Sequence, residues 1–172
     1  PQFTDVNWCE QTGSTNADLL GATPTPMGHS ALRGAFVQTA GRGRAGRTWV
    51  NTRGQTLMFA VGFQTALMAP ELNGLSIALG VGACQALTKV LPSGTASHAI
   101  TLKWPNDLMV NDRKLAGILV ETQISRQRIR VVAGIGINLS QADRLSQQLS
   151  RPIAAWGDLA PVHDDAVVEM VS

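Results

Sequence analysis

One long helical pattern among many strand-like segments is the feature that most restricts the fold. The most apolar stretch of the 172 residues runs from Leu72 to Leu91, is broken by Gly74, Gly80 and Gly82, and carries Lys89. It is too interrupted to span a bilayer and therefore predicts a buried helix. A chain that offers one such helix beside several strands favours the α+β class.

Short apolar segments in the rest of the chain predict strands, and polar residues between them predict turns and helix starts. The expected strands are Phe3 to Glu10, Leu32 to Thr39, Thr56 to Phe63, Ile100 to Lys103, Leu108 to Val110, Ala116 to Glu121 and Arg130 to Ile137, with a turn at Asn111 and Asp112. The expected short helices start at Ser14, Thr15 or Asn16 and run through Leu20, cover Asp143 to Leu149, and begin again at Asp164. Together they predict a mixed, mainly antiparallel sheet with helices packed on it.

Length and composition favour one domain with a core of its own. The chain is 44% hydrophobic and 15% charged, which is enough apolar material for a core and does not indicate disorder. The sequence does not begin with the apolar run of a signal peptide.

Cysteine and histidine spacing gives no sign of a disulfide framework or a metal site. Cys9 and Cys84 show no C-x-x-C spacing, which fits a reducing cytoplasm. The three histidines show no metal-ligand spacing, so we expect no protein-bound metal.

Positive charge is concentrated in one interval. No acidic residue lies between Asp18 and Glu71, and the arginines of that interval are Arg33, Arg42, Arg44, Arg47 and Arg53. A block of one sign usually faces an anion, although a solvated basic loop has the same composition.

The Gly41 to Arg47 segment matches G-x-G-x-x-G but lacks the context of a dinucleotide fold. Thr48, Trp49 and Val50 follow it, and these residues start a helix poorly. No acidic residue lies about twenty positions further on, where a ribose contact would require one. The chain also has no P-loop pattern, so both common nucleotide-binding loops are excluded.

The composition of the same loop indicates another use. Its glycines allow the backbone to approach a ligand closely, and Arg42, Arg44 and Arg47 offer planar cationic groups that grip carboxylate or phosphate. We expect the loop to be mobile when empty and to become ordered over an anionic ligand. An RNA-binding segment rich in arginine and glycine is the alternative.

Two of the three lysines flank a polar turn later in the chain. Lys103 is followed by Trp104, Pro105, Asn106 and Asp107, and Lys114 precedes an apolar strand that contains Gly117. The amide and carboxylate at the turn are suited to a lysine head or to a phosphate that carries magnesium. A lysine at a strand edge is also often only solvated. The Gly134 to Asn138 segment is open to two interpretations, a bulge with a cap or a wall against which a nucleotide packs.

Five segments, taken in order, resemble the signature set of the biotin protein ligases. They are Ser14 to Asn16, Gln38 to Trp49, Lys103 to Asp107, Arg113 to Leu119 and Gly134 to Asn138. The resemblance implies the fold of a biotin or lipoate ligase catalytic domain, which is similar to that of class II aminoacyl-tRNA synthetases. It also implies ATP with Mg²⁺ as co-substrate, biotin as substrate, biotinyl-5′-AMP as intermediate, and a lysine of a biotin carboxyl carrier domain as acceptor.

The resemblance also implies roles for individual residues. Lys114 and Arg44 would be catalytic. Binding of biotin and its adenylate would involve Ser14, Thr15, Asn16, Gln38, Gly41, Arg42, Gly43, Arg44, Trp49, Lys114 and Gly117. Nucleotide and phosphate contacts would come from Lys103, Asn106, Asp107, Asn138 and Trp156. For Trp49 and Trp156, core packing is the alternative to contact with the ligand.

Family members often carry further domains and partners. Many bacterial members begin with a DNA-binding domain, and members carry an SH3-like barrel after the catalytic domain; we expect residues 1–172 to hold the catalytic domain alone, with no repressor function. Family members often pair through the sheet edge, so a homodimer is possible. The rivals are a lipoate-type ligase with the same fold, a biotin-binding module that is inactive without a C-terminal domain, and the RNA-binding protein.

Overall fold

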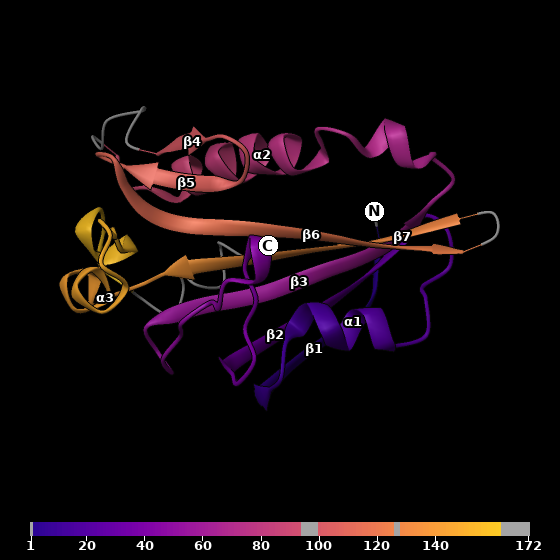
Figure 1. The fold of residues 1–172 in the computed structure, drawn as a ribbon, viewed down its shortest axis with the longest axis horizontal. Helices are drawn as coiled ribbons and strands as arrows, with labels where there is room; N and C mark the ends of the chain where they lie inside the picture. Colours follow the sequence, from indigo (N-terminus) through magenta and orange to yellow (C-terminus); the bar gives the residue numbers. More distant parts are fainter. Residues whose placement is uncertain (1, 94–99, 126–127, 163–172) are drawn as a thin grey trace.

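The computed structural model describes residues 2–93, 100–125 and 128–162, and within them seven strands form one sheet (Figure 1). The strands are β1 (Gln2–Thr12), β2 (His29–Gln38), β3 (Thr56–Thr65), β4 (Thr101–Lys103), β5 (Asp107–Val110), β6 (Arg113–Ser125) and β7 (Arg128–Asn138). The α-helices are α1 (Thr15–Gly21), α2 (Leu75–Val90) and α3 (Ala142–Leu149), and short 3₁₀ turns occur at Arg44–Gly46, Ala69–Leu72 and Trp156–Asp158.

The sheet is mixed and mainly antiparallel, as the sequence predicts. Its order is β1-β2-β3-β7-β6-β5-β4, in which β1 and β2 are parallel and each other neighbouring pair is antiparallel. Every predicted strand is present, with shifted ends: β2 begins at His29 and β6 continues to Ser125. The predicted turn is also present, because Asn111 and Asp112 both adopt positive φ angles, 47° and 58°.

Helices lie on both faces of the sheet (Figure 1). On the face of α2, Leu57, Leu87 and Ile137 belong to the larger buried cluster. On the face of α1, Leu19 and Ala60 belong to a smaller one. Because side chains alternate along a strand, β3 supplies Leu57 to one cluster and Ala60 to the other. The sheet is therefore the middle layer, and the α1 face is left with room for a cavity.

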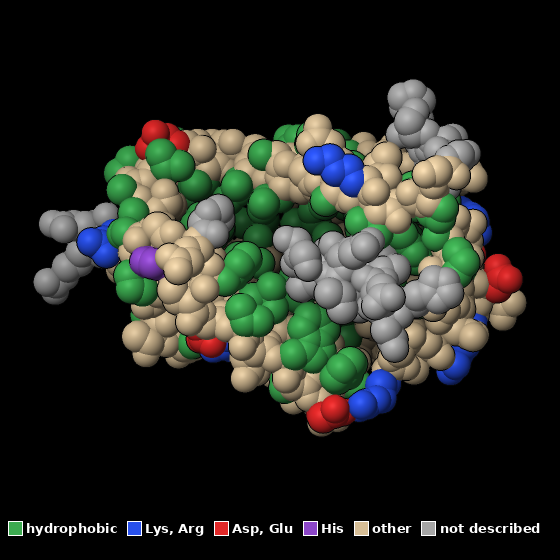
Figure 2. All heavy atoms as spheres, turned by 180° about the vertical axis from the view of Figure 1, so that it is seen from behind, with side chains coloured by type: hydrophobic (Ala, Val, Ile, Leu, Met, Phe, Trp, Pro, Cys, Tyr) green, Lys and Arg blue, Asp and Glu red, His purple; other side chains and the backbone are tan. Residues whose placement is uncertain are grey.

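Helix α2 corrects one prediction. Only Gly80 and Leu87 of its residues are buried, so the expectation of a buried helix is wrong. The helix packs through one side, where a side chain at Gly80 would meet Leu102, and within the described residues no second helix covers its outer side. An apolar groove of about 610 Å³ runs between α2 and the sheet, and Figure 2 shows hydrophobic side chains gathered around a recess on this side of the molecule.

No helix in the described ranges is long and apolar enough to cross a membrane. Helix α3 lies where the sequence predicts it, whereas the helix expected from Asp164 lies outside the described residues.

Candidate active site

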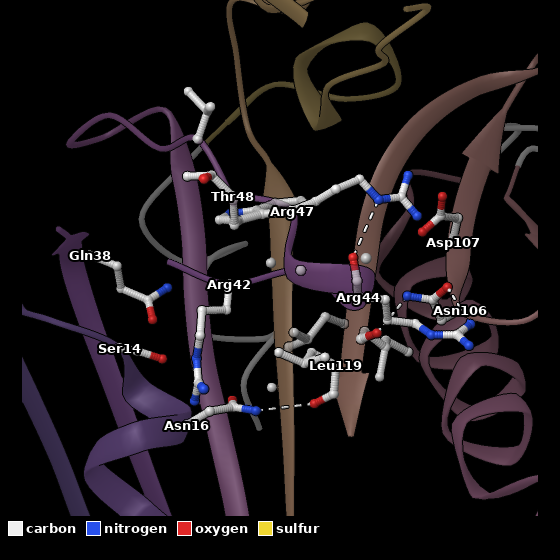
Figure 3. Close-up of a pocket in the computed structure, with 18 of the residues that line it drawn as sticks. Ser14, Asn16, Gln38, Arg42, Arg44, Arg47, Thr48, Asn106, Asp107 and Leu119 are labelled. Atoms are coloured by element: carbon white, nitrogen blue, oxygen red, sulfur yellow. Dashed lines mark hydrogen bonds between the residues drawn. The ribbon is translucent and has the colours of Figure 1, made fainter. Parts of the chain in front are cut away.

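A cavity of about 480 Å³ opens on the α1 face of the sheet, between the start of α1, the Gly41 to Arg47 segment (the Gly/Arg loop) and strands β5 to β7 (Figure 3). It brings together segments that lie as far apart in sequence as Ser14 and Arg151. The wall residues to which the resemblance assigns a role are Ser14, Thr15, Asn16, Gln38, Arg42, Gly43, Arg44, Trp49, Asn106, Asp107, Lys114 and Gly117.

The neutral polar end of the cavity is built by the start of α1. Ser14 is extended, and its hydroxyl caps the helix by accepting from the Ala17 N–H at 3.5 Å. A cap of this kind satisfies an N–H that the helix leaves free and sets where the helix begins. The first turn then places Thr15 against Gln38, whose Oε1 accepts from the Thr15 backbone N–H at 2.8 Å. Ser14, Thr15 and Asn16 are all buried, so this end presents hydrogen-bonding groups that are shielded from bulk water.

The Gly/Arg loop is folded back on itself over the cavity. The Trp49 N–H donates to the Gly41 carbonyl at 2.9 Å, and the Gly43 N–H donates to the Arg47 carbonyl at 2.7 Å. A side chain at Gly41 would lie 2.8 Å from the Trp49 carbonyl oxygen, so this close crossing requires glycine. Gly41 itself does not line the cavity; it closes the base of the loop.

Arg44 and Arg47 of the loop lie at the cationic end of the cavity, whereas Arg42 is directed toward Asn16 (Figure 3). Arg44 donates from Nη1 to Asn106 Oδ1 at 3.3 Å, and Asn106 is held in turn by donating to the Ile118 carbonyl at 2.7 Å. Arg47 donates from Nε to the Arg44 carbonyl at 3.3 Å and lines the cavity together with Asp107. The two arginines therefore face the turn that precedes β5, and they leave donors free for an anion between them.

Lys114 is the most enclosed cation of this end. Its Nζ donates to Asp107 Oδ1 at 2.6 Å, and its side chain is only 13% exposed. Burial lowers the pKa of the Lys114 ammonium below the usual range of a lysine, although the ion pair with Asp107 opposes this; Arg151 and Arg47 lower it further. The lysine head also lies 5.6 Å from the centre of the Trp49 ring.

The backbone at Lys114 is clamped from behind. Its N–H donates to the Pro152 carbonyl at 3.1 Å and its carbonyl accepts from Ala154 at 2.9 Å, so the segment after α3 adds a short parallel bridge to β6. Asn138, which is buried, donates to the carbonyls of both Lys114 and Ala154. These bonds hold the backbone of Lys114, and the ion pair with Asp107 then positions the lysine head in the cavity.

Three glycines of β6 and β7 form the floor of the cavity. A side chain at Gly134 would overlap Asn16, one at Gly136 would lie 2.5 Å from the Trp49 ring, and one at Gly117 would lie 3.0 Å from Lys114 Nζ. At Gly134 and Gly136 a methyl group would overlap the neighbouring side chain, and at Gly117 it would require the head of Lys114 to shift. The sheet backbone itself is therefore part of the surface that faces a ligand.

The tight packing at the glycine floor should make substitution there destabilising. Replacing Gly134 with alanine should lower the free energy of unfolding by about 1–3 kcal/mol, because the methyl group must displace the buried Asn16. Urea denaturation measures the change. Gly82, on the surface of α2, has open space around it, so Gly82→Ala should keep or raise stability. Equal stabilities for the two variants would contradict the tight packing at Gly134.

Comparison with known proteins agrees with this geometry. A model of the biotin/lipoate A/B protein ligase family matches residues 13–138, a span that holds every cavity residue except Leu149 and Arg151. The chain belongs to this family.

Individual relatives are similar over most of the chain. The biotin–acetyl-CoA-carboxylase ligase of Mycobacterium tuberculosis is 37% identical over 134 residues, 77% of this chain and 48% of that protein. The ligase of the same name from Paracoccus denitrificans is 41% identical over 135 residues, 77% of this chain and 53% of that protein. The chain thus spans about half the length of these curated relatives. Among solved structures, the biotin protein ligase of Aquifex aeolicus in complex with biotin and ATP matches with a TM-score of 0.73 and 26% identity, covering 98% of this chain and 68% of that one.

Four predicted site residues of this biotin/lipoate ligase family member lie outside the cavity wall. Gly41 and Asn138 act from behind it, on the loop and on Lys114. Lys103 is exposed on the edge strand β4. Trp156 is fully buried in the larger core cluster, so the structure favours core packing over the stacking on adenine that was its other interpretation.

Several residues of the cavity wall have no role predicted from the sequence. Arg47 belongs to the loop that the sequence singles out, but the roles implied by the resemblance stop at Arg44. Arg151 follows α3, and only the bridge to β6 brings it beside Lys114. The other wall residues without a predicted role are Thr48, Val50, Phe59, Ile118, Leu119, Gly134, Ile135, Gly136 and Leu149. Of these, Gly134 to Gly136 lie in the segment for which a wall is one of the two interpretations.

Proposed function

We propose that the chain activates biotin with ATP to biotinyl-5′-AMP and passes the biotin to a lysine of a biotin carboxyl carrier domain. The observation that carries this proposal is the polarity of one cavity, which joins a neutral hydrogen-bonding end at α1 to a cationic end at Lys114. Such a cavity suits a molecule with an uncharged polar ring and a carboxylate, placed so that the carboxylate meets the phosphates of a nucleotide.

The neutral end supports recognition of the ureido ring. A cyclic urea has one carbonyl acceptor and two N–H donors. Ser14 and Thr15 carry hydroxyls that donate or accept, and the amides of Asn16 and Gln38 do both. The glycine floor and Trp49 supply an apolar surface for the rest of the ring system.

The cationic end supports the first chemical step. The biotin carboxylate oxygen attacks the α-phosphorus of magnesium-bound ATP, the bond to the β-phosphate bridge breaks, and pyrophosphate leaves. Both reactants are anions, so the fixed positive charges of Arg44, Arg47, Lys114 and Arg151 offset their repulsion and the charge that builds up at the phosphorus. Asn106 and Asp107 would offer oxygen atoms to a magnesium ion carried by the nucleotide.

The second step transfers the acyl group. The acceptor lysine, as a free amine, attacks the carbonyl carbon of the mixed anhydride, an amide bond forms, the amine loses a proton, and AMP leaves. The Gly/Arg loop lies over the cavity and would limit the access of water to the anhydride until the carrier arrives. We place the reaction in the cytoplasm, which fits the unpaired Cys9 and Cys84.

The relatives support biotin over lipoate. Both curated relatives described above are named as biotin ligases, and the Aquifex aeolicus structure holds biotin and ATP. The contacts of the arginines favour the cavity over an extended RNA-binding segment, because Arg42 and Arg44, although exposed, line the cavity and are tied to Glu121 and Asn106.

The test is thermal unfolding with biotin, with magnesium and ATP, and with all three, followed by mass spectrometry of the retained ligand. We expect a large rise in the unfolding temperature only with all three, and a bound mass of biotinyl-5′-AMP. A ligand that binds only the folded state stabilises it by an amount that grows with the logarithm of the ratio of its concentration to its dissociation constant. A rise with biotin alone would indicate a binding module. Lipoyl-AMP in preference to biotinyl-AMP would indicate the lipoate activity, and no response to any of them would contradict the proposal.

A further inference from the structure

We propose that Glu121 is a positioning residue that sets the ring specificity of the neutral end and couples it to the Gly/Arg loop. The inference rests on the proposed function, since it concerns how the same cavity selects biotin. Glu121 is the last residue of the predicted strand Ala116–Glu121, lies within β6 in the structure, and does not line the cavity itself.

One carboxylate oxygen of Glu121 holds two cavity residues from different parts of the chain. Its Oε2 accepts from Asn16 Nδ2 at 2.9 Å and from Arg42 Nη2 at 3.0 Å. The Glu121 side chain is 23% exposed, and that of Arg42 is 47% exposed. The carboxylate therefore joins α1 to the loop across the open side of β6, and Figure 3 shows Arg42 reaching down from the loop to Asn16.

These contacts fix the orientation of the Asn16 amide. Nδ2 also donates to the Leu119 carbonyl at 3.2 Å, so both groups on that side of the amide are acceptors and only the NH₂ group satisfies them. The Asn16 carbonyl oxygen must then face the other way, toward the glycine floor at Gly134. Within the described residues no donor bonds to this oxygen, so it is an acceptor offered to the ligand.

The orientation has a consequence for specificity. A buried carbonyl oxygen is satisfied by a ligand N–H and is left unpaired by a ligand ring that has none. A cyclic urea carries such an N–H, and a dithiolane ring does not. Without Glu121 the amide loses its charged acceptor and can rotate, so the neutral end no longer distinguishes the two rings.

The same carboxylate anchors the loop. Because Arg42 and Asn16 share Oε2, a ligand that stabilises Asn16 in its place also stabilises the carboxylate to which the loop is tied. The Arg42 pair is partly solvated and hence weak enough to release the loop when ligand enters or product leaves.

The test compares Glu121→Ala and Glu121→Gln with Glu10→Gln. Glu10 on β1 pairs with Arg53, which follows the Gly/Arg loop in sequence. Both side chains are exposed and neither lines the cavity, so this control removes an exposed ion pair after the loop without touching Asn16. Pyrophosphate release gives KM for biotin and for ATP, and the same assay with lipoate gives the discrimination between the acids.

For Glu121→Ala we expect KM for biotin to rise about tenfold or more, KM for ATP to stay within about twofold, and the preference for biotin over lipoate to fall. Glu121→Gln keeps an acceptor for Asn16 and should restore part of the biotin KM. Glu10→Gln should match the wild type. An unchanged biotin KM, or an equal rise in both KM values, would overturn the proposal.

Failure of the proposed function is recognised separately, because the wild-type chain would then release no pyrophosphate with biotin. The anchoring of the loop is still measurable in that case, by the rate of trypsin cleavage between Arg42 and Arg47. Cleavage that is faster in Glu121→Gln than in Glu10→Gln supports the anchor, and equal rates overturn it.

Discussion

Replacing Lys114 with alanine should slow the formation of biotinyl-5′-AMP by about a hundredfold or more, comparable to the loss of one donor from an oxyanion hole. The reason is the position of Lys114 Nζ, whose side chain is only 13% exposed and is held by the ion pair with Asp107 on a hydrogen-bonded backbone. A preorganised charge in a shielded site does not have to reorient when the two anions approach each other. Without the positive charge of Lys114, the repulsion between the biotin carboxylate and the α-phosphate is no longer offset at this position.

Single-turnover adenylate formation, measured by mass spectrometry, checks this prediction. Lys89→Ala is the matched control, because Lys89 is exposed on α2 and remote from the cavity wall. The control should form adenylate at the wild-type rate. If Lys114→Ala does so too, while remaining folded, Lys114 has no part in the first step.

Replacing Trp156 with alanine should lower the free energy of unfolding by about 3–5 kcal/mol, which is a large part of the stability of a typical domain. Its indole is fully buried among Leu139, Ile137 and other members of the larger cluster. Truncation removes this contact area and leaves a cavity that the surrounding sheet and turn cannot fill completely. The indole N–H has no partner in the structure, so Trp156→Phe should cost much less.

Urea denaturation measures the free energy of unfolding of both variants, which are compared with the wild type provided that the m-value is unchanged. Trp104→Ala is the control. Trp104 is 75% exposed, and its loss should change stability by less than about 0.5 kcal/mol. The kinetics of Trp156→Phe address the alternative role of this residue. A core residue leaves KM for ATP unchanged, whereas a marked rise in that KM in a stable protein would return Trp156 to the nucleotide site.

The local structure could be predicted from the sequence because short-range rules decide it. Ser14 caps α1 as its side chain chemistry indicates, Asn111 and Asp112 turn the chain, and alternation of apolar residues marks the central strands. Pairing could not be predicted in the same way. Strands β3 and β7 are adjacent although Thr56 and Asn138 lie more than eighty residues apart, and only the burial of both faces selects that partner.

The candidate site shows the same division. The loop arginines and Lys114 stand out because charge and glycine are rare in such combinations. Arg151 does not stand out, because its place beside Lys114 depends on a bridge between two distant segments. Glu121 was hidden for another reason: a carboxylate at the end of an apolar strand usually marks the return to solvent, and only the fold shows that Asn16 and Arg42 meet it.

The glycine floor limits how the substrate range of this cavity can change. At Gly117, Gly134 and Gly136 the side chains are already at the minimum size, so substitution there can only exclude molecules and never admit larger ones. An enlarged biotin analogue therefore has to be accommodated by trimming the walls, with Trp49 the bulkiest side chain in contact with the floor. Directed evolution toward such analogues should accumulate changes in the loop and at the start of α1, and should leave β6 and β7 untouched at these three codons.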